Sequence, residues 1–286
     1  MKEGRSDFRI FQHTFFRMNK LTTLFLGTVL SSSMLPGWTA APPKPYGAIP
    51  TPAQINWQRM EFYGFIHFGL NTFTGREWGY GDEDPKIFNP TDFNASDIVS
   101  TFKKGGMKGM IYTAKHHDGF CAWPTKSTDH NITKSPWKNG KGDVVREFAL
   151  ACKKHGIKFG TYLSPWDRNN ADYGKDGYLD VYYKQIRELL TNYGPVFEIW
   201  FDGANGGDGY YGGAREKRNI GDAEKYYNFE KIVEMIRKIQ PSCIIWGAGH
   251  YGDARWGGSE KGHVNYPHWS TVGLNGGGGG LSLIHI

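Results

Sequence analysis

Short apolar runs alternate along the chain with longer segments in which apolar residues recur at helical spacing. The apolar runs predict strands, at residues 62–69, 109–115, 158–164, 196–202 and 243–249. The segments between them predict helices, at residues 95–106, 143–156, 179–193 and 223–240. Strands that alternate with helices in this order form parallel βαβ units.

The helix predicted at 143–156 carries signals at both ends. Asp143 can accept hydrogen bonds from the free backbone N–H groups at its start, and Gly156 can take the left-handed conformation that closes it. Val145, Phe148 and Cys152 recur at helical spacing, so we expect them on the buried face.

Two folds consist of repeated βαβ units: the doubly wound open sheet and the (β/α)₈ TIM barrel. No glycine fingerprint of the G-x-G-x-x-G type follows the first strand, which disfavours the nucleotide-binding open sheet. Every predicted strand leads at its C-terminal end into a long polar loop, where barrel enzymes build their active sites. The sequence therefore predicts an α/β fold, a (β/α)₈ barrel of which residues 42–275 supply five βα units, so that the barrel is incomplete.

The two ends of the chain differ from the rest. Residues 1–17 are polar and are expected to be a spurious upstream extension. Residues 18–41 combine Lys20, a short apolar run and small residues at a cleavage site, as a secretory signal peptide does. That run is too short to span a bilayer, so we expect a secreted or periplasmic protein without a stable membrane anchor. Residues 276–286 are expected to be a low-complexity, non-native tail.

Composition and charge limit the classes of partner and ligand that we expect. Half of the formal net charge of +6 lies in the first 41 residues, and no basic stripe remains elsewhere, so no nucleic-acid partner is expected. Aromatic residues make up 15% of the chain, which suits a flat, partly apolar ligand such as a sugar ring, although aromatic residues also fill cores. The cysteines Cys121, Cys152 and Cys243 lack metal-type spacing and are expected to be buried or free thiols.

The stretch "EIWFDGANGG" passes from a buried strand into a glycine-rich loop, with Asp202 at the boundary. Because strand side chains alternate, Glu198, Trp200 and Asp202 lie on one face and apolar residues on the other. A half-exposed strand would show the same division, so the pattern alone does not establish a site. Glu198 is expected to be a deep carboxylate paired with a cation.

Polar and aromatic residues follow the C-terminal end of each predicted strand, and in a barrel these ends meet at one rim. They are His67 and the loop 71–85, then His116, His117 and Asp118, then Tyr162 and Trp166, then Asp202, and finally Arg255 and Glu260. Of the adjacent pair His116 and His117, at least one must lie in the loop.

Two chemistries fit this set: glycoside hydrolysis by two carboxylates, and hydrolysis at a metal held by His and Asp. Adjacent histidines are poorly placed for joint ligation, and Gly69 stands where a metal site would favour a second histidine after His67. We therefore favour the glycosidase, without a metal.

Four stretches then resemble the α-L-fucosidases of glycoside hydrolase family 29, in the order in which that family has them. They are "GFIHFGLNTFTGREWGYGDEDP", "TAKHHDGFCAWPTKST", "GTYLSPWDRN" and "EIWFDGANG". The resemblance runs from about residue 55 to residue 269. It implies a (β/α)₈ barrel, usually followed by a β-sandwich, that cleaves terminal α-L-fucose from glycans with retention of configuration and needs no cofactor.

The resemblance also implies roles for individual residues. Asp202 matches the catalytic nucleophile, and "ARWGGSEKG" resembles the stretch that carries the acid/base in the branch preferring α-1,3/1,4-linked fucose, which implies Glu260. Glu77 is the competing acid/base. The positions matched to substrate binding are His67, Glu77, Trp78, His116, His117, Tyr162, Trp200 and Arg255. A non-catalytic fucose-binding barrel and a metal-dependent barrel hydrolase remain as alternatives.

Overall fold

The computed structural model describes residues 41–44, 49–254, 272–273 and 281–282. Its main sheet has five strands in the order β1-β2-β3-β4-β7, and every neighbouring pair is parallel. These strands are β1 (Gly64–Ile66), β2 (Gly109–Lys115), β3 (Lys158–Leu163), β4 (Val196–Trp200) and β7 (Ile244–Trp246). Each new strand is added beside the preceding one, which is the order of consecutive units in a barrel and confirms the α/β prediction.

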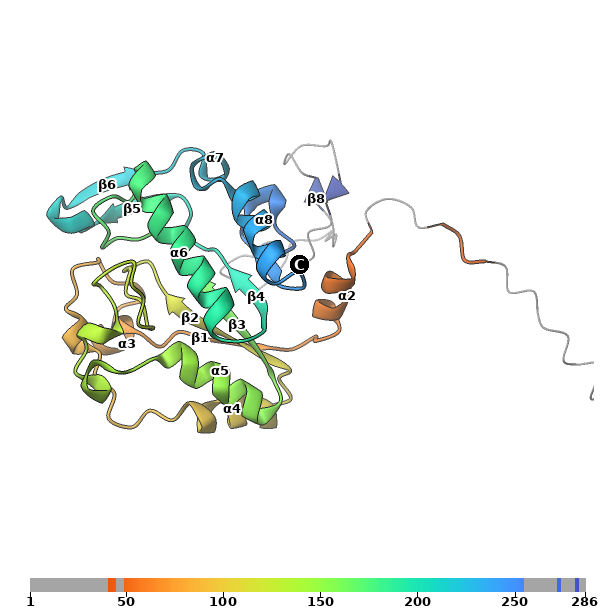
Figure 1. The fold of residues 1–286 in the computed structure, drawn as a ribbon, viewed down its shortest axis with the longest axis horizontal. Helices are drawn as coiled ribbons and strands as arrows, with labels where there is room; N and C mark the ends of the chain where they lie inside the picture. Colours follow the sequence, from red (N-terminus) through yellow and green to blue (C-terminus); the bar gives the residue numbers. More distant parts are fainter. Residues whose placement is uncertain (1–40, 45–48, 255–271, 274–280, 283–286) are drawn as a thin grey trace, which may run out of the picture. The chain divides into compact units, whose positions relative to one another are not determined.

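Helices connect the strands and cover the sheet. The longer ones are α4 (Ala95–Lys104), α5 (Val144–His155), α6 (Asp176–Asn192) and α8 (Phe229–Ile239), and the shorter ones are α2 (Pro52–Gln58), α3 (Leu70–Thr74) and α7 (Ala223–Tyr227). Short 3₁₀ turns are η1 (Pro85–Ile87), η2 (Ile132–Lys134), η3 (Trp137–Gly140), η4 (Tyr211–Gly213) and η5 (Gly249–Tyr251). Helix α4 packs against α5, and α6 packs against α8, as Figure 1 shows.

Helix α5 forms as its sequence predicts. The Asp143 carboxylate accepts a hydrogen bond from the backbone N–H of Arg146 at 2.9 Å, and Gly156 ends the helix with a φ of 67°. Phe148 and Cys152 are buried against the sheet, in a core that also takes Met110 and Tyr112 from β2. This core lies between the helices and the outer face of the sheet, so the inner face is left to the residues discussed below.

Two segments differ from the sequence prediction. The helix expected at 223–240 is broken at Asn228, whose φ of 51° ends α7 and whose side chain caps the start of α8 at Lys231. The glycine-rich loop after β4 contains an antiparallel hairpin of β5 (Gly206–Gly209) and β6 (Glu216–Asn219). Glycine-rich sequence has a low strand propensity, so pattern alone does not reveal this hairpin.

The short strands β8 (Val272–Gly273) and β9 (Leu281–Ser282) also pair.

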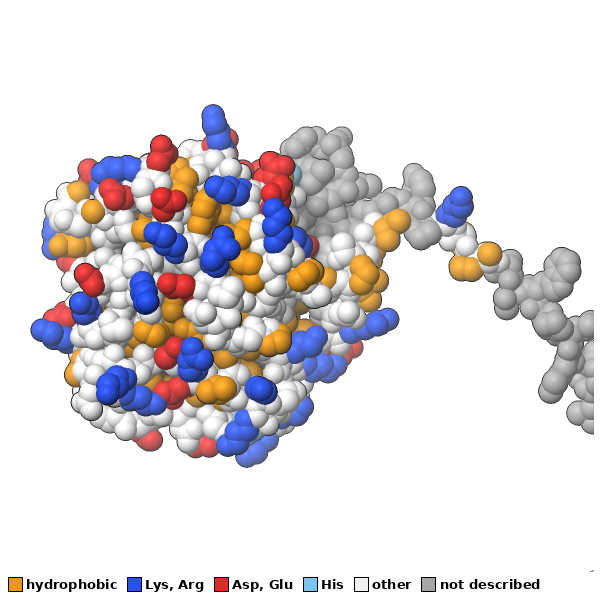
Figure 2. All heavy atoms as spheres, in the orientation of Figure 1, with side chains coloured by type: hydrophobic (Ala, Val, Ile, Leu, Met, Phe, Trp, Pro, Cys, Tyr) orange, Lys and Arg blue, Asp and Glu red, His pale blue; other side chains and the backbone are white. Residues whose placement is uncertain are grey.

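Charges of both signs are interspersed on the face of the molecule drawn in Figure 2. No helix in the described part of the chain is long and apolar enough to cross a membrane. The signal peptide expected at 18–41 lies almost wholly outside the described residues, as do the extension at 1–17 and most of the tail at 276–286.

Candidate active site

Asp202 lies two residues beyond the end of β4, at the C-terminal rim of the sheet. The phenol of Tyr162 on β3 donates a hydrogen bond to Asp202 Oδ2 at 3.0 Å. Gly203, with a φ of 79°, follows directly, and a Cβ there would lie 2.4 Å from Cε1 of His117. Glycine is therefore required at this turn, because any side chain would push the imidazole away from the Asp202 loop.

The imidazoles of His67 and His116 lie beside the Tyr162 ring. The ring centroids of His67 and His116 are 5.4 Å apart. The Tyr162 ring centroid lies 5.8 Å from that of His67 and 5.5 Å from that of His116. His67 Nδ1 also pairs with the Thr113 hydroxyl at 2.8 Å. Because β2 ends at Lys115, both His116 and His117 lie in the following loop, as the sequence requires of at least one of them.

Tryptophans lie on either side of this histidine group. His117 packs against Trp78 and Trp166, each with its ring centroid 5.1 Å away. Trp78 is 41% exposed, so one part of its surface is free to meet a ligand. Trp200 stacks on Trp246 at 3.9 Å and touches Phe65, which in turn stacks on His67. The structure thus brings the predicted residues from β1, β2, β3 and β4 into one continuous group.

The ionisable groups around Asp202 favour their neutral forms. Partial burial lowers the pKa of His67, and burial lowers the pKa of His116 to about 4 with a further contribution from the charge on His67. Burial and the neighbouring His116 hold the pKa of His117 well below its usual range. Burial and the Asp202 charge raise the pKa of the Tyr162 phenol, so it remains a hydrogen-bond donor. Among the described residues, Asp202 therefore lies beside donors and acceptors that favour their neutral forms.

A pocket of about 410 Å³ opens beside this group, and His67, Glu77, His116 and Asp118 are among the residues that line it. Glu77 is exposed, whereas Asp118 is buried and accepts hydrogen bonds from Phe120 N and Asn71 Nδ2. Burial raises the pKa of Asp118 to about 7. Glu77, the competing acid/base, therefore lines the same pocket as two predicted sugar-binding histidines.

A larger cavity, of about 1190 Å³, lies at the other end of the strands. Its lining includes Trp57, Met60, Phe159, Val196 and Phe197, and none of its described lining residues is a histidine or a carboxylate. Size alone would favour this cavity as the site, but its described lining offers no carboxylate to act as the nucleophile or acid/base of a glycosidase. We therefore place the site at the rim that carries Asp202, next to the smaller pocket, whose lining includes His67 and His116 but not Asp202 itself.

The partners of Glu198 differ from those that the sequence predicted. It is fully buried, and its carboxylate accepts hydrogen bonds from the indole N–H groups of Trp57, at 2.7 Å, and Trp200. Within the described ranges these donors and Tyr63, not a cation, are its partners. Neutral indoles satisfy the oxygens without burial of a second charge. Burial raises the pKa of Glu198 to about 7.

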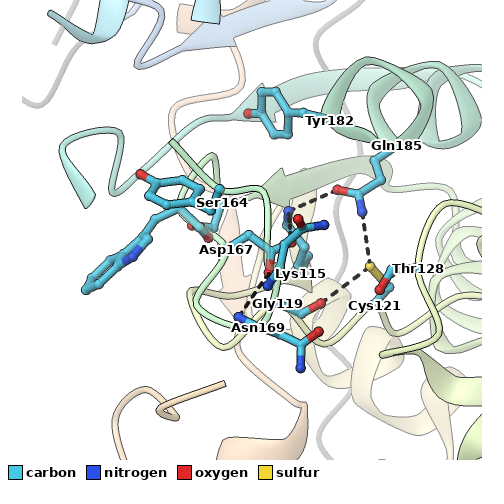
Figure 3. Close-up of polar contacts among 12 residues, drawn as sticks. Lys115, Gly119, Cys121, Thr128, Ser164, Asp167, Asn169, Tyr182 and Gln185 are labelled. Carbon is cyan, nitrogen blue, oxygen red and sulfur yellow. Dashed lines mark hydrogen bonds and ion pairs between the residues drawn. The ribbon is translucent and has the colours of Figure 1, made fainter. Parts of the chain in front are cut away.

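Sequence reasoning missed a buried ion pair between Lys115 and Asp167, shown in Figure 3. Lys115, the last residue of β2, is 0% exposed, and its Nζ donates to Asp167 Oδ2, Tyr178 OH and Gln185 Oε1 at 3.2, 3.0 and 2.9 Å. Asp167 Oδ1 in turn accepts from two backbone N–H groups of its own loop, those of Asn169 and Asn170. The only sequence signal was a lysine at the end of an otherwise apolar strand.

Arg168 is a second buried, charged residue that the sequence analysis missed, and it is almost fully buried. It donates to the backbone oxygen of Gly79, next to Trp78, and its guanidinium lies 4.9 Å from the ring centroid of Tyr80 and 5.0 Å from that of Trp166. Arg168 thereby ties the loop that carries Glu77 and Trp78 to the loop after β3.

Two predicted residues, Arg255 and Glu260, lie outside the described residues. In the part of the chain that is described, no three His, Cys, Asp or Glu side chains are grouped so that they could hold a metal ion. The three cysteines are free and buried, as their spacing suggests.

A family model described as alpha-L-fucosidase matches residues 46–268. This chain belongs to the α-L-fucosidase family. Alpha-L-fucosidase 1 of Arabidopsis thaliana is 42% identical over 260 residues, which cover 88% of this chain and 48% of the plant protein. The crystal structure of a glycoside hydrolase 29 family member from an unknown rumen bacterium is 50% identical, with a TM-score of 0.80, over 84% of this chain and 45% of that one.

Another structural relative in the α-L-fucosidase family is a Ruminococcus gnavus fucosidase solved in complex with fucose. It is 34% identical, with a TM-score of 0.68, over 80% of this chain and 49% of its own. The chain thus spans about half the length of these relatives. The likeness to these family 29 structures agrees with the fold prediction: the described parallel sheet is consistent with an incomplete (β/α)₈ barrel.

Proposed function

We propose that the protein containing this chain is a retaining exo-α-L-fucosidase that releases terminal α-L-fucose from fucosylated oligosaccharides or glycoconjugates. The proposal rests on the Asp202 carboxylate, which lies at the end of β4 beside Tyr162 and close to a group of neutral histidines. Membership of the α-L-fucosidase family supports the same chemistry.

In this mechanism Asp202 is the nucleophile. One of its oxygens forms a bond to the anomeric carbon while the bond from that carbon to the leaving oxygen breaks, and an acid donates a proton to the leaving oxygen. The residue that acted as the acid then acts as a base and takes a proton from water. The water oxygen attacks the anomeric carbon, and the bond from that carbon to Asp202 breaks, which releases fucose. The hydrogen bond from Tyr162 to Oδ2 fixes the orientation of the carboxylate before reaction.

The histidines and tryptophans suit the remaining sugar surface. His67, His116 and His117 favour their neutral forms, in which an imidazole has one donor and one acceptor nitrogen. Nδ1 of His67 pairs with Thr113 and Nδ1 of His117 pairs with Ser164, which leaves Nε2 of each ring for a sugar hydroxyl. The exposed part of Trp78 can cover an apolar edge of the ring. We also assign Glu77, Tyr162, Trp200 and Arg255 to fucose binding.

Glu260 is the proposed acid/base, with Glu77 as the competitor. Retaining glycosidases place their two carboxylates roughly 5–5.5 Å apart, so the acid/base should approach Asp202 to about that distance. Replacement of the true acid/base by Ala should impair hydrolysis of natural glycans far more than that of aryl fucosides, whose leaving groups need little protonation. Glu260→Ala and Glu77→Ala are therefore compared on both substrates in the full-length protein, and an equal loss on both substrates for Glu260→Ala would transfer the role to Glu77.

The proposal also includes the glycosidic linkage that the enzyme cleaves and the location of the enzyme. The likeness of "ARWGGSEKG" to the α-1,3/1,4 branch supports preference for α-1,3- or α-1,4-linked fucose over α-1,2-linked fucose. The signal-like residues 18–41 support a secreted or periplasmic enzyme. Initial rates on matched trisaccharides test the first statement, and N-terminal sequencing of the mature protein tests the second.

One assay separates the proposal from its alternatives. Purified full-length protein should release the chromophore from an aryl α-L-fucoside, and the rate should be the same after treatment with a chelator. Binding of L-fucose without release would instead identify a non-catalytic fucose-binding barrel, and loss of activity with chelator would identify a metal-dependent hydrolase.

A further inference from the structure

Ser164, the residue after β3, is fully buried beside the active site (labelled in Figure 3). Its hydroxyl oxygen lies 2.6 Å from His117 Nδ1, 2.8 Å from the backbone oxygen of Trp166 and 3.2 Å from the backbone oxygen of Asp202. One hydroxyl thus joins the imidazole to the backbone of the proposed nucleophile.

The number of protons at this hydroxyl decides the direction of each hydrogen bond. A serine hydroxyl has one proton to donate, and both backbone oxygens can only accept. If this proton went to His117 Nδ1, both backbone oxygens would face the serine oxygen with no proton between them. The arrangement that pairs one of them has the serine donating to Trp166 or Asp202 and the imidazole donating to the serine. A neutral imidazole carries its proton on one nitrogen only, so this nitrogen is Nδ1 and Nε2 keeps a lone pair.

We propose that Ser164 is a positioning residue that holds His117 in the Nδ1–H form, so that Nε2 accepts a hydrogen bond from a hydroxyl group of the bound sugar. This inference rests on the proposed function, because it gives a specific role to one histidine of that site. Within the described part of the chain, Nε2 makes no hydrogen bond to the protein.

Packing keeps the ring in this orientation. The centroids of His116, Trp78 and Trp166 lie 4.3, 5.1 and 5.1 Å from that of His117, and Gly203 leaves room for the Cε1 edge. Burial, with the charges of His116, Arg168, His67 and Lys115, lowers the pKa of His117. A second proton on Nε2, which would abolish its role as an acceptor, is therefore disfavoured.

The first test reads the tautomer directly and does not need activity. In full-length protein with ¹⁵N-labelled histidine, the imidazole ¹⁵N shifts at neutral pH are assigned to His117 by comparison with His117→Asn. We expect an N–H-type Nδ1 and an unprotonated Nε2 in the wild type, and a mixture of both tautomers in Ser164→Ala. Thr161→Val is the matched control, since it removes a buried β3 hydroxyl that has no hydrogen-bond partner among the described residues, and it should keep the wild-type tautomer.

The second test adds L-fucose. Binding should shift the Nε2 signal of the wild type, and Ser164→Ala should bind L-fucose about ten- to a hundredfold more weakly, since the sugar hydroxyl loses its acceptor in part of the molecules. An Nε2–H form in the wild type, an unchanged tautomer in Ser164→Ala, or an Nε2 signal unmoved by bound fucose would each overturn the proposal. If wild-type protein binds fucose but does not hydrolyse fucosides, the proposed activity is wrong while the tautomer result still stands.

Discussion

At the scale of the residue, the geometry around Asp202 gives a direct test of its role. Asp202→Gly removes the nucleophile and leaves space at the anomeric carbon, so we expect turnover of an aryl α-L-fucoside to fall by at least about three orders of magnitude. Azide should enter the vacated space and partly restore turnover, with β-L-fucosyl azide as the product. Product analysis by NMR checks this, and near-normal activity without azide would remove Asp202 from the mechanism.

His116 should make stability depend on pH. Its pKa of about 4 in the folded protein lies below the ordinary 6.5, because burial penalises the charged ring. Such a group stabilises the fold above its unfolded pKa, and this contribution is lost as the pH falls from about 6.5 to about 4, because the unfolded chain binds the proton first. The full contribution of His116 to the free energy of unfolding is about 3 kcal/mol.

The measurement compares urea unfolding of the full-length wild type and its His116→Asn variant between pH 4 and 7. The comparison is needed because Asp118 and Glu198, whose pKa values are raised to about 7, change stability in the opposite direction over this range. The wild type should lose more of its free energy of unfolding than the variant as the pH is lowered. Parallel curves would show that His116 binds its proton equally well in the folded and unfolded protein.

At the scale of the element, the buried Lys115–Asp167 pair joins β2, the loop after β3 and α6. Lys115→Met leaves the Asp167 charge buried without its partner and should cost about 3–5 kcal/mol of stability. Adding Asp167→Asn removes that charge but keeps an acceptor for the loop, so the double variant should recover most of the loss. Urea unfolding measures both.

A surface pair provides the control for this prediction. Lys134 and Asp129 form an ion pair whose side chains are 53% and 94% exposed, so Lys134→Met should change stability by no more than about 1 kcal/mol. A loss at Lys115 no larger than that at Lys134 would mean that the buried pair does not hold these elements together.

The same elements show what sequence could predict. Apolar periodicity located the strands of the main sheet and the four main connecting helices, and the parallel order then placed His67, His116, Tyr162 and Asp202 at one rim. It missed the break at Asn228 because Asn is compatible with helical spacing, and its left-handed φ depends on local context. It missed Asp167 as a partner of Lys115 and Trp57 as a partner of Glu198 because these residues lie 52 and 141 positions away, beyond any local pattern.

At the scale of the whole molecule, the described sheet has β1 and β7 as its outer strands, and a cavity of about 1190 Å³ lies at the N-terminal ends of its strands. Outer strands expose unpaired backbone groups that favour aggregation. A folded domain is stable by only about 5–15 kcal/mol, so an open edge and unfilled apolar surface can remove most of that margin.

We therefore expect residues 42–286, expressed alone, to be insoluble or to lack fixed tertiary packing, and to show no fucosidase activity. The catalytic groups would be present, but a site that is loosely held loses much of its rate advantage, because the reacting atoms are no longer kept in position. Calorimetry and an aryl fucoside assay of this fragment, with the full-length protein as the control, make the measurement. A sharp cooperative melting transition together with measurable hydrolysis would show that the five strands are sufficient to hold Asp202 and its neighbours in place.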